Sequence, residues 1–116
     1  MNKLLKTAFF FILFDVIYLT LTSKYFQKQI MLIQGSPMKI NIFKLLLTYL
    51  VLILGYYTFV IRKNLSIKES FLLGLFVYAV YELTNYSIFN KWNLLTVLLD
   101  SLWGGILFAL IRYFVK

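Results

Sequence analysis

Long apolar runs separated by short polar segments dominate the pattern along the chain. Each run contains at most one charged side chain, and the four of them cover residues 7–23, 45–61, 70–90 and 92–111. About 20 apolar residues let a helix cross the hydrocarbon core of a bilayer, so the pattern predicts four transmembrane helices. None of the runs has the polar face that a soluble helix presents to water. We therefore expect an all-α membrane protein, an antiparallel bundle with helices at about 4–23, 42–62, 69–90 and 93–114.

The segment after the first run mixes apolar and basic residues up to Ile33, and Gly35 suits the end of a helix. This composition is typical of a helix that lies on the membrane surface, with Tyr25 and Phe26 at the level of the headgroups. We expect the first helix to run past Ser23 into an interfacial extension after the membrane span. A plain surface anchor is the simpler interpretation, and a lid over the bundle is the alternative.

The remaining connections are short. Ser66 and Glu69 have the spacing of a capping box before the third run. Asn90 to Asn93 make a tight turn that joins the last two helices into an antiparallel hairpin, where Trp92 has the position of an interfacial anchor. No linker divides the chain, so we expect a single transmembrane domain over residues 1–116.

Composition narrows the possible chemistry. The chain has 116 residues, 62% of them hydrophobic and 14% charged, which fits the membrane class and a lipid bilayer as its surroundings. It has no Cys and no His, so disulfides, thiolate metal sites and histidine chemistry are excluded. The twelve basic residues are spread between the apolar runs, not clustered, so we expect no nucleic-acid partner.

Loop charges favour one orientation in the membrane. An even number of spans puts both chain ends on one side, and that side carries seven Lys and Arg residues against five on the other. Basic loops stay preferentially in the cytoplasm, so we expect an integral membrane protein with both termini cytoplasmic. The small difference leaves dual topology open.

Three of the four acidic residues lie inside the apolar runs. Glu82 comes nine residues before Lys91 and Asp100 nine residues after it, so both lie about 13 Å from the hairpin turn. Asp15 is equally far from Lys6 and Lys24, near the middle of its own run. The spacing therefore predicts three carboxyl groups at one depth near the bilayer midplane, with no Lys or Arg inside any run to neutralise them.

A central carboxylate costs at least about 2.5–3.5 kcal/mol to insert, so the acids must share protons, meet water or hold a cation. Aromatic residues accompany them at helical spacing, and an acid beside aromatic faces suits an organic cation through cation–π attraction. The candidate ligand-binding or proton-relay residues are Asp15, Tyr18, Tyr78, Tyr81, Glu82, Asn85, Asp100 and Trp103. The alternative is that the acids are hydrogen-bonded packing residues between helices.

Glycines in the last two helices are candidates for close helix packing. Gly104 and Gly105 allow another backbone to approach, with Gly74 as their counterpart in the third helix. Three carboxylates can also attract a divalent cation, but without His the sequence leaves any metal unknown. No cofactor motif and no activated nucleophile is present, so we expect no cofactor and favour a protein that is not an enzyme.

From Gly74 the chain reads G-x₃-Y-x₂-Y-E-L-T-N-x₆-W-x₇-D-x₂-W-G. This string resembles the signature of an uncharacterised membrane family, domain of unknown function 2177, whose members carry Y-D-L-T-N, a Trp and then D-x-x-W-G. The family's first helix carries D-x-x-W-L, which resembles the segment Asp15 to Leu19. Glu82 and Tyr18 depart from the family's usual Asp and Trp but keep similar chemistry.

The resemblance implies a small four-helix membrane protein whose shared feature is its three acids. Bacterial members often occur beside lipid-modification genes, which points to lipid chemistry. Such proteins also occur in large DNA viruses, which points to a viral membrane.

Three functions fit these features. The first is a transporter- or channel-like protein whose acidic cluster binds or relays protons or cations; four helices are few to enclose a pathway, so we expect a homo-oligomer. The second is a membrane protein that binds or modifies a small lipid-soluble ligand. The third is a structural membrane component, for example of a virion, in which the acids serve only in packing.

Overall fold

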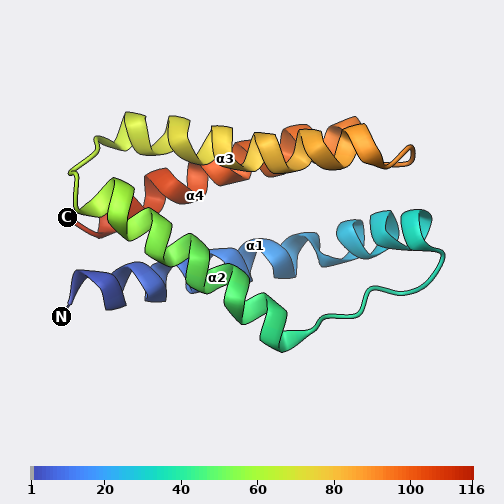
Figure 1. Cartoon of the computed structure of the whole chain (residues 1–116), viewed down its shortest axis with the longest axis horizontal. Helices are drawn as coiled ribbons and strands as arrows, with labels where there is room; N and C mark the ends of the chain where they lie inside the picture. The colour runs from blue at the N-terminus through green and yellow to red at the C-terminus, as the bar shows by residue number, and fades with distance from the viewer. Residues whose placement is uncertain (1) are drawn as a thin grey trace.

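The computed structural model describes residues 2–116, and within that range it contains four long helices and a π-helical turn (Figure 1). All four helices, η1 being counted with α2, are long and apolar enough to cross a membrane, which confirms the predicted all-α bundle. Both ends of the described chain lie at the same end of the bundle. The elements are α1 (Lys3–Gln34), α2 (Ile42–Tyr56), η1 (Tyr57–Ile61), α3 (Ile67–Ile88) and α4 (Leu94–Phe114).

Local sequence signals determine where several helices begin and end. The Ser66 hydroxyl accepts from the Glu69 amide at 3.0 Å, and the Glu69 carboxylate accepts from the Ser66 amide at 3.1 Å. This is the expected capping box, and it satisfies amides that the first turn of α3 leaves unpaired. Gly35 ends α1 in the left-handed conformation, with φ 71°, that glycine adopts without steric cost.

The first helix continues past Ser23 and ends at Gly35, as its sequence predicts. It runs unbroken to Gln34, and its last turns lie against the turn between α3 and α4. Gln29 is only 5% exposed: its amide nitrogen donates to the Lys91 carbonyl at 2.8 Å, and its amide oxygen accepts from the Thr96 hydroxyl at 3.0 Å. Burying Gln29 is tolerable because these partners satisfy it, so the segment after residue 23 is part of the bundle.

The apolar core lies at the end of the bundle that holds the chain ends. Three aromatic rings meet there edge to face, Phe11 with Tyr56 and Phe108, with centroids 4.8–6.0 Å apart. The Tyr56 hydroxyl donates to the Phe108 carbonyl at 2.7 Å, so this buried polar group is satisfied. The cluster closes this end of the molecule. Other buried members of the core are Ile53, Val60, Ile61, Leu107, Ile111 and Val115.

Helices α3 and α4 form a tight antiparallel hairpin. Gly74 and Gly104 face each other so closely that a Cβ added at Gly104 would lie 2.6 Å from the Gly74 carbonyl oxygen. A Cβ at Gly105 would lie 2.8 Å from the ring of Phe71. The structure thus brings the three candidate packing glycines to the contact between these helices.

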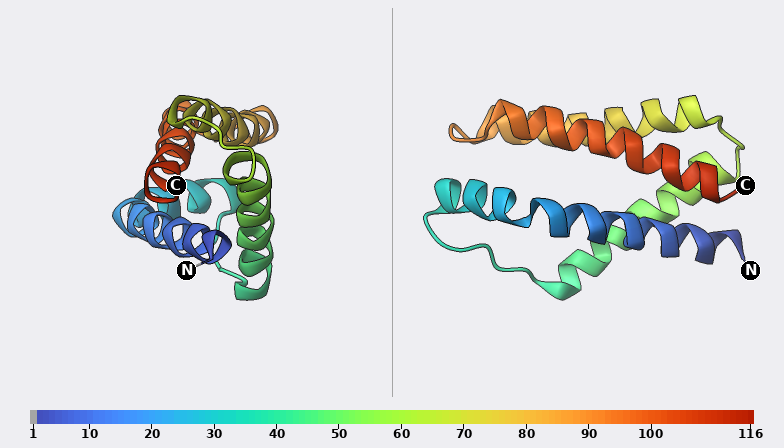
Figure 2. Two further views of the ribbon diagram at one scale, coloured as in Figure 1. Left: turned by 90° about the vertical axis from the view of Figure 1, so that its left-hand side faces the viewer. Right: turned by 180° about the vertical axis from the view of Figure 1, so that it is seen from behind.

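Helix α2 is attached much less firmly. It crosses the bundle obliquely, near α3 at its C-terminal end and diverging from α3 toward its N-terminus (Figures 1 and 2). The residues of α2 that are buried begin at Ile53, so its first eleven residues make no fully buried contact. The divergence leaves room for a cavity between α2 and the other helices.

Candidate functional site

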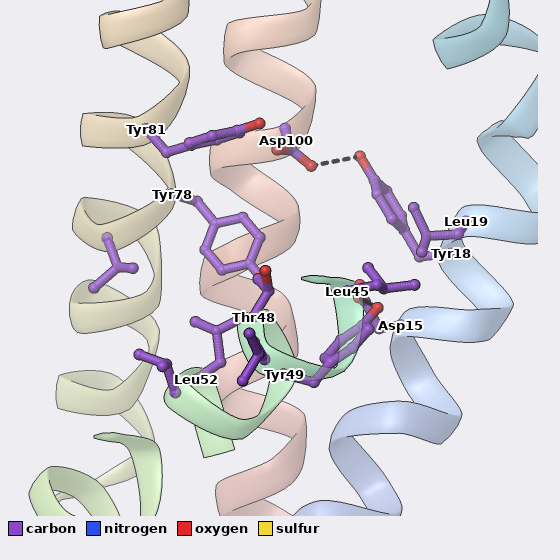
Figure 3. A pocket seen from close by; sticks show the side chains of 13 residues that line it. Asp15, Tyr18, Leu19, Leu45, Thr48, Tyr49, Leu52, Tyr78, Tyr81 and Asp100 are labelled. Carbon is purple, nitrogen blue, oxygen red and sulfur yellow. Dashed lines mark hydrogen bonds between the residues drawn. The ribbon is translucent and has the colours of Figure 1, made fainter. Parts of the chain in front are cut away.

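A cavity of about 680 Å³ opens between the four helices (Figure 3). All four helices contribute to it. Two carboxyl groups and four tyrosines face it from several sides, and the rest of the wall is almost wholly aliphatic. Its lining residues are Asp15, Tyr18, Leu19, Leu45, Leu47, Thr48, Tyr49, Val51, Leu52, Val77, Tyr78, Tyr81 and Asp100.

Asp15, from α1, is buried and held by aromatic donors on two other helices. The Trp103 indole of α4 donates to Oδ1 at 3.1 Å, and the Tyr49 hydroxyl of α2 donates to Oδ2. Both carboxylate oxygens are thereby oriented by groups whose rings also exclude water.

Asp100, from α4, is held in the same way by α1. The Tyr18 hydroxyl donates to Oδ1 at 3.2 Å (Figure 3). The rings of Tyr18 and Trp103 stack face to face, with centroids 4.4 Å apart and an interplanar angle of 1°. The contact is reciprocal: each helix carries an acid followed three residues later by an aromatic residue, and each aromatic residue donates to the acid of the other helix.

Glu82, from α3, lies outside the cavity wall and is only 1% exposed. The Trp92 indole donates to its Oε1 at 2.9 Å. Trp92 is itself buried, so it serves as a partner of Glu82 and not as the interfacial anchor that its position suggests. On its other side Glu82 lies within interaction range of the Asp100 carboxyl.

The three acids form a staggered series. Asp15 meets Trp103 one helical turn away from the level at which Tyr18 meets Asp100, and the Asp100 carboxyl group lies near both Asp15 and Glu82. Within residues 2–116 no group of three acids is arranged to hold a metal ion. The acids of the described residues are thus neighbours along the bundle and do not form one three-ligand cluster.

The other candidate residues take different places. Tyr18, Tyr78 and Tyr81 line the cavity, whereas Trp103 stands behind Tyr18 as its stacking partner. Asn85 lies further along α3 than Glu82 and outside the cavity wall.

Sequence reasoning missed Tyr49 and Thr48, which α2 contributes to the wall, and the role of Trp92. The available signal was weak: Tyr49 is one of three tyrosines in an apolar run without charge, and nothing within the run sets it apart. Its partner Asp15 lies on another helix, so spacing within the run could not reveal the contact.

The charged residues that line the cavity are all acidic. Among the lining residues there are two acids and no Lys or Arg. Charge interactions are strong where water is scarce, so an ionised Asp15 or Asp100 attracts positive charge into this space. Tyrosine ring faces add to the attraction for a cation.

Comparison with known proteins agrees with this architecture. A family model described as predicted membrane protein (DUF2177) matches residues 1–114, nearly the whole chain. Searches of curated proteins and of solved structures find no match. The match spans all four membrane-length helices and the three intramembrane acids. The chain therefore belongs to the DUF2177 family of predicted membrane proteins.

Proposed function

We propose that this membrane protein is a small carrier that binds a proton or a cation at Asp15 and Asp100 and moves it across the bilayer. One observation carries the proposal: carboxyl groups from α1 and α4 face a common cavity whose wall has no basic residue. The cost of two such acids in the membrane is offset when a proton or cation occupies the site.

The pairing of acids supports exchange between protons and cargo. Neighbouring carboxyl groups titrate as a coupled set, so the arrival of a cation at one of them favours release of a proton from the set. Glu82 extends the set beyond the cavity through its interaction with Asp100. In this mechanism Asp15 and Asp100 contact the cargo, and Glu82 accepts or returns a proton.

The loop charges and the size of the chain bear on the orientation of the carrier in the membrane and on its assembly. We propose that both termini are cytoplasmic and that two or more copies assemble, because four helices enclose little space for a pathway.

Proton movement in proteoliposomes tests the proposal. With a pH gradient across the vesicle membrane, the wild type should change the lumenal pH, alone or when a metal or quaternary ammonium cation is added. The variant Asp15→Asn/Asp100→Asn should lose this flux. Glu69→Gln is the matched control, because Glu69 is an exposed acid at the start of α3, far from the cavity, and Gln preserves the capping box. Absence of flux from folded wild type contradicts the proposal.

A structural role is the second candidate. Each of the three acids accepts a hydrogen bond from an aromatic side chain, and two of them from another helix, which is what packing residues require. In that case neutralising the acids should lower stability or assembly, while wild type and variants alike show no flux.

A further inference from the structure

Building on the proposed carrier function, we propose that its cargo is an amphiphilic organic cation that enters sideways from the lipid between α2 and α3. Its charged centre would lie between Asp15 and Asp100, and its apolar groups along the seam between α2 and α3.

The size of the cavity favours an organic molecule over a bare ion. Its volume of about 680 Å³ lies within the range of roughly 300–1,000 Å³ that is common for small-molecule pockets. A proton or a dehydrated metal ion needs a few close oxygen ligands and no such space. Most of the wall is also aliphatic, which would be unfavourable for a strongly hydrated ion.

A second hollow continues the cavity along the seam. It has a volume of about 200 Å³ and shares Val51, Leu52 and Val77 with the main cavity. No acid or base lines it, and its one tyrosine, Tyr56, has its hydroxyl bonded to the Phe108 carbonyl. The charged part of one ligand would thus lie beside the two carboxyl groups in the larger space. Its apolar part would lie against the apolar wall of the smaller space.

The same seam is the open side of the cavity. The aromatic cluster of Phe11, Tyr56 and Phe108 closes the end toward the chain termini. At the seam, by contrast, Val51 is 70% exposed on α2 and Tyr81 is 60% exposed on α3. These positions lie on membrane-length helices, so their surroundings are lipid and not water. A ligand that uses this entrance must first dissolve in the bilayer.

Charge complementarity selects a cation. An anion would meet the carboxyl groups of Asp15 and Asp100 with no basic lining residue to offset them. A neutral lipid would fill the apolar seam but gain nothing from the two acids. An apolar cation satisfies both parts of the wall and can lie against the ring faces of Tyr18 and Tyr78, as cation–π contacts require.

Three probe ions separate these possibilities in equilibrium binding to the full chain in nanodiscs, with empty nanodiscs as the blank. Tetraphenylphosphonium is an apolar cation, tetramethylammonium carries the same charge with little apolar surface, and tetraphenylborate matches the first in shape with opposite charge. We expect saturable binding of tetraphenylphosphonium. Tetramethylammonium should compete at least about tenfold more weakly, and tetraphenylborate, measured by itself because it precipitates with tetraphenylphosphonium, should show no saturable binding. Equal binding of either comparison ion overturns the proposal.

The entrance is tested with a matched pair of variants on α2. Val51→Trp places a large ring at the seam, whereas Leu50→Trp adds the same ring at an exposed neighbour outside the cavity wall. Val51→Trp should slow the association of tetraphenylphosphonium at least about tenfold and Leu50→Trp less than about twofold, because an obstacle in the entrance acts on the rate of entry. An unchanged association rate for folded Val51→Trp rules out the lateral entrance.

Failure of this inference is distinguishable from failure of the carrier function. If tetraphenylphosphonium does not bind but the wild type still shows proton flux that depends on Asp15 and Asp100, only the cargo class is wrong. If both the flux and the binding are absent, the carrier function itself fails.

Discussion

At the scale of single residues, the main feature is the reciprocal pairing of α1 with α4. Asp15 accepts from Trp103 and Asp100 accepts from Tyr18, while the two rings stack. Both helices use the same spacing of an acid and an aromatic residue. The antiparallel arrangement of the helices turns this repeated spacing into two crossed hydrogen bonds.

Tyr18 provides a test of this pairing. Tyr18→Phe keeps the stacked ring but removes the donor to Asp100, so the free energy of unfolding should fall by about 0.6–1.7 kcal/mol, as for other hydrogen bonds between membrane helices. Tyr18→Trp should lower the free energy of unfolding less, because an indole can also donate a hydrogen bond to Asp100. Reversible unfolding in mixed micelles measures both variants. A Tyr18→Trp variant less stable than Tyr18→Phe would contradict the assigned donor role.

Trp92 and Glu82 form the second residue-scale test. Trp92→Phe leaves the buried Glu82 carboxyl without its indole donor and should cost about 1–3 kcal/mol of unfolding free energy. In a Glu82→Leu background the same substitution should cost much less, since no buried acceptor remains. A double-mutant cycle measures the difference; equal costs in the two backgrounds would mean that Trp92 contributes packing alone.

At the scale of elements, α3 and α4 behave as one unit because their backbones touch at Gly74 and Gly104. Gly74→Ala should lower the unfolding free energy by about 1–3 kcal/mol, since the added methyl group has no space and the neighbour is backbone. Gly55→Ala on α2 is the control, because nothing lies within 4 Å of its added Cβ. The same unfolding assay should show little or no destabilisation there.

The C-terminal part of α1 is a second element with a specific anchor. Gln29 connects it to the turn between α3 and α4 through hydrogen bonds to Lys91 and Thr96. Gln29→Leu removes these bonds and should speed hydrogen exchange in residues 24–34, while residues 7–20 keep their protection. Unchanged exchange in 24–34 would show that apolar contacts alone hold this segment.

At the scale of the whole molecule, both ends of the bundle are held together and its side is open. The aromatic core packs the helices at the end near the chain termini, and a hydrogen bond of Gln29 joins them at the opposite end. Between them, α2 diverges from a rigid hairpin (Figure 2). We therefore predict that the first half of α2 is more mobile than α3 and α4, because it has no fully buried residue and is held to α1 through the hydrogen bond from Tyr49 to Asp15.

Spin labels test this mobility, and the absence of Cys makes paired Cys labelling unambiguous. Labels at Leu46 on α2 and Phe76 on α3, both exposed, should give a broad distance distribution. Labels at Leu72 on α3 and Leu102 on α4, also exposed, should give a narrow one. Pulsed dipolar spectroscopy measures both pairs, and equally narrow distributions would contradict a mobile α2.

The sequence by itself determined the features that depend on local interactions. Four helices follow from apolar runs of membrane length, and the capping box and the glycine that ends α1 follow from hydrogen bonds within a few residues. The family followed from motifs whose residues are close together in the chain. The intramembrane acids were also visible, because a charge inside an apolar run stands out whatever the tertiary structure.

Only the tertiary structure decided what those acids contact. Asp15 and Trp103 are 88 residues apart, and Tyr18 and Asp100 are 82 apart, so their pairing depends on how α1 packs against α4. The packing of the end of α1 against the bundle, the burial of Trp92 and the contribution of Tyr49 likewise depend on contacts with other elements. Periodicity within one run says which face of a helix is polar, but not which helix that face meets, and the cavity exists only because α2 diverges from its neighbours.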